Sequence, residues 1–349
     1  MAEIYVLVNK FILYIIGMIF MKASYLKLSV DEIARRVTQA NQILTKCTLC
    51  PRACKVNRTK GELGFCESGL EVIISSAGPH LGEEPPISGS KGSGTIFFTN
   101  CNLRCVFCQN YQISQQAQGR PITTGELSDT MLSLQKQECH NINLVSPTHF
   151  VPQILEALAL VIPKGLKIPI VYNTNGYDSL GTLKLLDGIV DIYLPDIKYG
   201  NERQQPNPVR GKYAQEYSGI DNYVKHNRLA LKEMYRQVGN LVMDENGIAQ
   251  KGLLIRHLVL PHRLSGTFDC LDFIAKEISK DAYISLMSQY HPSHKAHQHP
   301  LINRRLKQSE YKEVVAYAEK LGLENCYIQE LVSSDDFLPD FQKENPFGK

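Results

Sequence analysis

The feature that most constrains the fold of this chain is a regular alternation, from residue 94 onward, of short β-rich runs with helical patterns. Six runs are mostly continuous apolar stretches, as expected for strands covered on both faces. They span residues 94–99, 141–146, 169–173, 189–195, 253–260 and 283–289. Because strands that alternate with helices favour a parallel sheet, we predict an α/β fold, specifically a partial (β/α)6 TIM-like barrel. In such sheets the chemistry lies at the carboxyl ends of the strands.

Local signals support the helices between these runs. Thr123 and Glu126 have the spacing of a capping box, and Pro152 suits the first turn of the next helix. Near the end of the core, we expect Ser309 to cap a helix that Gly322 closes. The helical segments also carry apolar stripes, which indicates that they pack against the sheet.

Composition divides the chain into successive parts. We assign residues 1–22 to an apolar N-terminal segment, 23–90 to a four-cysteine accessory segment, 91–330 to the α/β core and 331–349 to a polar C-terminal tail. Within the core, residues 201–211 form a polar, proline-containing loop. The acidic tail is expected to be solvated.

The N-terminal segment contains an uncharged apolar run, residues 11–21, that is too short to span a bilayer, which needs about 20 apolar residues. Glu3 spoils the basic region that a signal peptide requires. Because Met18 and Met21 lie at the end of the run, we interpret residues 1–22 as a mis-assigned start of translation. A membrane anchor is the alternative, although we do not expect membrane association.

Charge and cysteine content narrow the function classes. Lys and Arg total 38 against 35 Asp and Glu, and the resulting net charge of +3 is too small to attract a polyanion, so we expect no nucleic-acid partner. The chain is too large to need disulfide staples, and seven of its ten cysteines fall between residues 47 and 108. This clustering indicates metal ligation in a reducing compartment, and we predict a cytoplasmic location.

Cys101, Cys105 and Cys108 follow directly on the first predicted strand, so their thiols lie on a loop at a carboxyl strand end. Thiolate sulfur is the soft ligand that iron–sulfur clusters select, and three thiolates leave one iron of a [4Fe-4S] cluster open to a cosubstrate. A structural zinc site is the alternative, but it needs a fourth ligand, and the next histidine after Cys108 is His140. We therefore predict a [4Fe-4S] site on this loop.

Cys47, Cys50, Cys54 and Cys66 supply four more thiolates within twenty residues. Four clustered sulfurs in a reducing compartment indicate a bound metal. Zinc and a second iron–sulfur cluster are both compatible with this ligand set, and the spacing does not decide between them. A second cluster could relay electrons or bind substrate, whereas zinc would only fold the segment.

The cysteine motif CNLRCVFCQN resembles the CxxxCxxC motif of radical S-adenosylmethionine (SAM) enzymes, with an aromatic residue before the third cysteine. Over roughly residues 40–330 the chain resembles the uncharacterised radical SAM family that is similar to pyruvate formate-lyase activating enzyme. The motifs that carry this resemblance are CTLCPRACKVNRTKGELGFC, GSGTIFFTNCNLRCVFCQN, INLVSPTH, VYNTNGY, DIYLPDIKY and IRHLVLP. The resemblance implies that a [4Fe-4S] cluster cleaves SAM reductively to a 5′-deoxyadenosyl radical, which abstracts hydrogen. It also implies a reductant such as flavodoxin or ferredoxin, and a glycyl-radical-type protein as a candidate substrate.

The resemblance further implies SAM contacts at the ends of the strands. The expected cofactor-binding residues are Phe107, Ser146, Thr148, Asn173, Asn175, Asp196, Lys198 and Arg256. The family's Gly-Gly-Glu-like turn is replaced here by Ser146-Pro147-Thr148-His149, which lacks the acidic residue; the Ser146 and Thr148 hydroxyls or exposed carbonyls are the candidate acceptors for the SAM amino group. Arg256 lies inside an apolar run and needs a partner, either a SAM carboxylate or Asp196. We place Tyr290 and His291 at the barrel mouth as substrate contacts.

Two other functions remain compatible with these motifs. One is an iron–sulfur or zinc protein that transfers electrons without using SAM, in which every metal has four protein ligands. The other is modification of RNA or of a small metabolite by the same radical chemistry.

Overall fold

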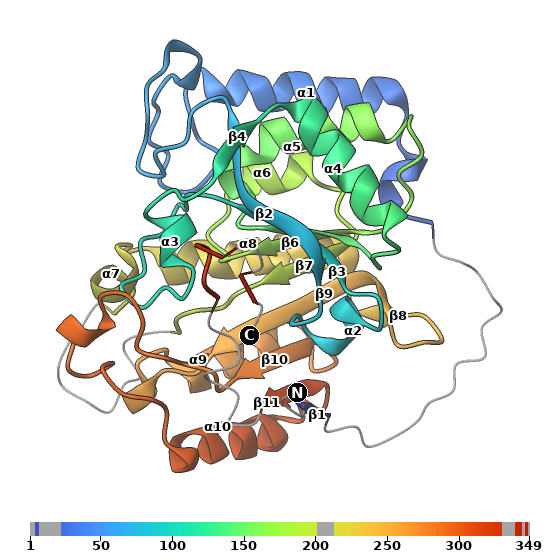
Figure 1. Ribbon diagram of the computed structural model, residues 1–349. Helices are drawn as coiled ribbons and strands as arrows, with labels where there is room; N and C mark the ends of the chain where they lie inside the picture. The colour runs from blue at the N-terminus through green and yellow to red at the C-terminus, as the bar shows by residue number, and fades with distance from the viewer. Residues whose placement is uncertain (1–3, 7–21, 201–212, 330–338, 344–345, 348–349) are drawn as a thin grey trace.

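The computed structural model describes residues 4–6, 22–200, 213–329, 339–343 and 346–347, and it shows an α/β architecture (Figure 1). The strands are β1 (Ile4–Val6), β2 (Val72–His80), β3 (Ser93–Phe98), β4 (Arg120–Ile122), β5 (Ile142–Val145), β6 (Ile170–Thr174), β7 (Ile192–Pro195), β8 (Val242–Met243), β9 (Ala249–Leu258), β10 (Tyr283–Met287) and β11 (Cys326–Gln329). The α-helices are α1 (Val30–Leu44), α2 (Pro85–Ser88), α3 (Tyr111–Ser114), α4 (Thr124–Lys136), α5 (Val151–Val161), α6 (Leu180–Leu185), α7 (Tyr213–Ser218), α8 (Tyr223–Val238), α9 (Thr267–Phe273) and α10 (Gln308–Leu321).

The strands form a sheet whose central part is parallel, in the order β3-β5-β6-β7-β9-β10-β11. Beyond β3, the strands β2 and β4 are antiparallel, and β1 is antiparallel to β11 at the other end. In the part of the chain that is described, this order is an open path, so the barrel is partial. The α/β prediction is confirmed, and all six expected strands are present; β2 and the additional parallel strand β11 were not expected.

Three of the four helix signals are confirmed. Glu126 N–H donates to Thr123 Oγ1 (3.1 Å) and Thr123 N–H to Glu126 Oε2 (2.8 Å), which completes the capping box of α4. Pro152 lies in the first turn of α5. The expected cap at Ser309 is wrong, because α10 begins at Gln308 and the Glu310 carboxylate accepts from the backbone N–H of Lys307 (2.9 Å). Gly322 closes α10 with a φ of +75°, as expected.

The helices and the sheet bury separate apolar layers. On the outer face of the sheet, Leu144 and Tyr172 share a core cluster with Leu155 of α5, and α5 packs between α1 and α4 (Figure 1). On the inner face, Ile87 of α2 is fully buried in a cluster with Ile192 and other strand residues. Each such side chain contributes about 1.5–3 kcal/mol by burial. The short helix α2 therefore fills the interior of the partial barrel from one end.

The two ends of the chain differ in what the structure describes. The apolar run 11–21 and the polar loop 201–211 lie outside the described residues. None of the described helices combines the length and apolar character needed to cross a membrane. The tail is not solvated throughout, because Phe341 is only 8% exposed and its ring lies 5.4 Å from that of Phe97 on β3. Apolar contact with the barrel thus overrides the polar composition of the tail.

His257 is a buried structural histidine on β9. Its Nδ1–H donates to the Ile197 carbonyl (2.6 Å), so Nε2 is left to accept from the Thr267 hydroxyl (2.8 Å). Burial lowers the pKa of His257 to about 4. A second proton at Nε2 would break the bond from Thr267, because a protonated ring has no acceptor.

Stability is therefore expected to fall as the pH falls. The folded-state pKa of His257 is below the unfolded value of about 6.5, so its contribution is complete above about pH 6.5 and is lost between there and about pH 4. The shift corresponds to about 3 kcal/mol. Urea unfolding at stepped pH should show a smaller loss in His257→Gln than in the wild type. Equal losses in the two proteins would contradict this account.

Candidate active site

The loop after β3 carries three cysteines within hydrogen-bonding distance of neighbouring groups. Cys101 Sγ accepts from the backbone N–H of Leu103 (3.3 Å) and from Asn175 Nδ2 (3.3 Å). Cys105 Sγ lies 3.0 Å from Ser218 Oγ, and Cys108 Sγ lies 3.2 Å from Ser114 Oγ. N–H and O–H donors of this kind stabilise thiolates. Each of the three cysteines at this carboxyl strand end therefore has a neighbouring group that can stabilise its thiolate.

When no metal is bound, burial raises the pKa of all three thiols. It raises the pKa of Cys101 to about 12 and that of Cys105 to about 11, whereas the ammonium of Lys198 acts in the opposite direction on both. Ligation to iron removes the thiol proton and reverses this preference. The soft donor set and the nearby cation therefore fit an iron–sulfur cluster.

Within the described ranges, no three Cys, His, Asp or Glu side chains stand together as a site for a single metal ion. A [4Fe-4S] cluster binds each thiolate to a different iron. The three thiols can therefore serve one cluster without lying close enough together to share a single ion.

A buried network of charges lies within electrostatic range of this loop. Lys198 Nζ is 2.6 Å from Asp196 Oδ2, and Arg256 Nε is 3.2 Å from Asp196 Oδ1. Burial opposes the Asp196 charge, but the two cations outweigh it and lower the pKa of Asp196. Burial also opposes the charge on Lys198, and the Asp196 carboxylate outweighs it and raises that pKa. The structure thus brings Asp196, Lys198 and Arg256 together as a charged cluster rather than as a surface pair.

Glu83 and Glu84 complete this network and were missed by the sequence analysis. Glu83 precedes α2; its Oε2 lies 3.3 Å from Arg256 Nη1, and its Oε1 accepts from Asn143 Nδ2 (3.0 Å). Burial raises the pKa of both glutamates, and Arg256 opposes the shift. The sequence feature that could have identified them is a pair of adjacent acidic residues before Pro85, in an otherwise apolar turn. Only the insertion of α2 into the barrel shows that they face Arg256.

The expected SAM contacts fall in different parts of the site. Asn173 Oδ1 accepts from Arg256 Nη2 (2.5 Å), so Asn173 belongs to the charge network. Asn175 joins the cysteine loop through Asn102 Oδ1 (2.6 Å) as well as Cys101. Ser146 adopts a left-handed backbone (φ +57°), which turns the chain sharply after β5. Asn173, Asn175 and Ser146 therefore lie at the carboxyl ends of their strands, where the resemblance to radical SAM enzymes places the SAM contacts.

Thr148 has a buried protein partner, Asp178. Its hydroxyl is buried and donates to Asp178 Oδ1 (2.7 Å), and Asp178 also accepts from Tyr172 (2.9 Å) and Thr174 (2.7 Å). Burial raises the pKa of Asp178, which these donors oppose. Through Asp178, Thr148 is thus linked by hydrogen bonds to Tyr172 and Thr174 of β6. The sequence analysis did not single out Asp178, although it follows the polar run at the end of β6.

Aromatic side chains enclose the cysteine loop. The rings of Phe107 and Tyr290 meet edge to face with centroids 5.8 Å apart, and both residues are buried. The Tyr290 hydroxyl donates to the Ile302 carbonyl (2.8 Å), so it fixes the following loop. His291 lies next in this loop, with Nδ1 3.2 Å from Ser293 Oγ. Phe107 is placed to shield the thiols from solvent.

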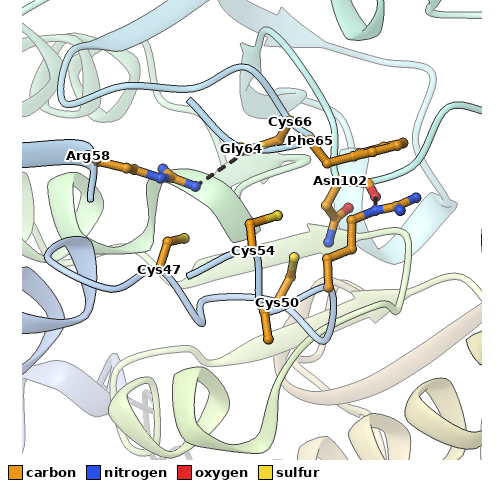
Figure 2. Close-up of a pocket in the computed structure, with 10 residues that line it drawn as sticks. Cys47, Cys50, Cys54, Arg58, Gly64, Phe65, Cys66 and Asn102 are labelled. Carbon is orange, nitrogen blue, oxygen red and sulfur yellow. Dashed lines mark hydrogen bonds between the residues drawn. The ribbon is translucent and has the colours of Figure 1, made fainter. Parts of the chain in front are cut away.

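The N-terminal cysteines line a small pocket (Figure 2). Cys47, Cys50, Cys54 and Cys66 all border it, together with Arg58 and other residues. Burial, followed by the neighbouring thiols, raises the pKa of Cys50 to about 12. The four cysteines that were grouped by their spacing thus border one pocket.

These features define the class of the protein: an α/β protein with a partial barrel and a three-thiol loop at the carboxyl end of a parallel strand. The family model described as the Radical SAM superfamily matches residues 95–233. The chain is also 34% identical over 305 residues to an uncharacterized protein of Methanocaldococcus jannaschii, a match that covers 84% of this chain and 80% of that protein. The chain belongs to the radical SAM superfamily and is a radical SAM enzyme, which implies a [4Fe-4S] cluster and SAM as its cofactors.

Among solved structures, the chain is similar to HydG, a maturase of the [FeFe]-hydrogenase. The two share 10% sequence identity with a TM-score of 0.45. The similarity covers 86% of this chain and 64% of the HydG chain, so the match spans less than two thirds of HydG.

Proposed function

We propose that this enzyme cleaves SAM reductively at a [4Fe-4S] cluster held by Cys101, Cys105 and Cys108, and that it uses the resulting radical to abstract a hydrogen atom from its substrate. The observation that carries this proposal is the position of the three thiols at the carboxyl end of β3, beside Lys198 and its partner Asp196. When bound, the cluster supplies one electron to the SAM sulfonium, which yields methionine and a 5′-deoxyadenosyl radical.

The protein's own residues hold and aim the cosubstrate. Arg256 and Lys198 are the cations at the strand ends that suit the SAM carboxylate, and the amide of Asn175 lies next to the cysteine loop. Phe107 and Tyr290 exclude water from the thiols. The Ser146 turn, with its hydroxyl and carbonyl, is our candidate acceptor for the SAM amino group.

For the substrate, we propose a protein that gains a glycyl radical through hydrogen abstraction from its backbone. Support comes from the motif resemblance to pyruvate formate-lyase activating enzyme. A low-potential one-electron donor of the flavodoxin or ferredoxin type would reduce the cluster. A cytoplasmic, reducing setting is consistent with ten cysteines that are all free thiols.

The test is direct detection of 5′-deoxyadenosine. Anaerobically reconstituted full-length protein is mixed with SAM and dithionite, and the product is measured by mass spectrometry. We expect 5′-deoxyadenosine and methionine in equal amounts, only when dithionite is present. Cluster-replete protein that forms neither product would overturn the proposed function.

A further inference from the structure

We propose that Ser218, aligned by Tyr199, donates a hydrogen bond to the Cys105 sulfur and thereby raises the reduction potential of the cluster on the cysteine loop. The inference deepens the proposed function and rests on it, because the same loop has to carry the cluster. Ser218 and Tyr199 act through the Cys105 sulfur, so they are positioning residues rather than catalytic ones.

The three side chains form a buried chain of contacts. Ser218 Oγ lies 3.0 Å from Cys105 Sγ, and the Tyr199 hydroxyl lies 2.7 Å from the same Oγ. Ser218 is fully buried and Tyr199 is only 2% exposed. Hydrogen bonds that are shielded from water in this way are electrostatically stronger than those on the surface, and neighbouring bonds in a chain polarise one another.

The direction of the two hydrogen bonds follows from the protons that are available. A cysteine sulfur that ligates a metal has lost its proton and can only accept, so the single hydroxyl proton of Ser218 points to Cys105. The Ser218 oxygen is then left to accept from Tyr199. Burial raises the pKa of the Tyr199 phenol well above its usual value, so this side chain keeps its proton and remains a donor. Ligation at Cys105 therefore orients both hydroxyls.

The backbone holds the serine against the cysteine loop. Ser218 is the last residue of α7, and the carbonyl of its neighbour Tyr217 accepts from the backbone N–H of Val106 (2.8 Å), the residue after Cys105. Tyr199 comes from a different part of the chain, the segment after β7. The hydroxyl at position 218 is thus held by two segments that the sequence separates from the cysteines.

A second group favours negative charge on the same sulfur. Lys198 precedes Tyr199, and its ammonium is within electrostatic range of Cys105. Reduction adds one negative charge to a cluster, and hydrogen bonds to the cluster sulfurs are among the factors that set its potential. The Ser218 hydrogen bond stabilises the reduced form more than the oxidised form. It therefore favours the one-electron reduction that precedes SAM cleavage.

Redox titration followed by EPR tests this inference on anaerobically reconstituted full-length protein without SAM. The signal to follow is the one that Cys105→Ala abolishes. In Ser218→Ala, we expect the ratio of reduced to oxidised cluster at a fixed potential to fall about tenfold, which is about 59 mV in midpoint potential for one electron. Tyr199→Phe keeps the serine hydroxyl but removes its alignment, so the midpoint potential should fall by a smaller amount.

Two matched controls remove buried hydroxyls elsewhere. Ser128→Ala deletes a buried hydroxyl that has no hydrogen-bond partner among the described residues, and Tyr25→Phe deletes a buried phenol that donates to the Ile168 carbonyl (2.9 Å). Neither variant should change the midpoint potential. A change in the controls as large as that in Ser218→Ala would contradict the inference.

An unchanged midpoint potential in cluster-replete Ser218→Ala would overturn the inference. If this variant does not bind the cluster, Tyr199→Phe decides: a lowered potential supports the inference and an unchanged one refutes it. The outcomes also separate the two proposals. Unchanged potentials in protein that forms 5′-deoxyadenosine sink only this inference, whereas a lowered potential in Ser218→Ala, with no 5′-deoxyadenosine from the wild type, sinks only the proposed function.

Discussion

Replacing Cys105 by alanine is expected to abolish SAM cleavage, with 5′-deoxyadenosine formation falling at least about 1,000-fold, or about 4 kcal/mol in barrier height. Cys105 is buried on the loop after β3, and its sulfur lies 3.0 Å from the Ser218 hydroxyl. The substitution removes one of three thiolates from a cluster that already has one iron without a protein ligand. The measurements are iron content and 5′-deoxyadenosine yield under anaerobic reduction.

Cys139→Ala is the matched control for this variant. Cys139 is also a buried free cysteine, but it lies outside both cysteine sets. Its replacement should leave the iron content and the product yield near those of the wild type. If Cys105→Ala keeps both properties as well, the ligand assignment is wrong.

Replacing Asp178 by alanine is expected to lower the free energy of unfolding by about 3–5 kcal/mol. The carboxylate is 1% exposed and accepts hydrogen bonds from Thr148, Tyr172 and Thr174. Alanine leaves three buried hydroxyls without this acceptor, and each loses about 1 kcal/mol or more. Denaturant unfolding measures the difference in free energy between the two proteins, and we expect the dependence of that free energy on denaturant concentration to be unchanged.

Two further substitutions sharpen this prediction. Asp178→Asn keeps one acceptor oxygen and nearly the same volume, so we expect a smaller loss than with alanine. Asp281→Ala, at an exposed aspartate, should change stability by no more than about 0.5 kcal/mol. A loss below about 1 kcal/mol in Asp178→Ala would contradict the structural role that we give to this carboxylate.

The sequence alone predicted the repeating part of the fold. The six runs beginning at residue 94 became parallel strands because each is a short apolar stretch that must be covered on both faces, and this requirement is local. The capping box at Thr123 and the closing turn at Gly322 were predicted for the same reason. The spacing of Cys101, Cys105 and Cys108 after a strand likewise identified the cysteine loop.

Tertiary structure alone decided which distant residues meet. Glu83 reaches Arg256 only because α2 fills the barrel interior, and Arg52 reaches Asn102 only because the N-terminal segment packs against the cysteine loop. The same holds for β11, whose place beside β10 follows from sheet pairing across forty residues. Periodicity, capping and motif spacing report on neighbours in the chain, whereas charge networks and shared pocket walls depend on packing between segments that the sequence separates.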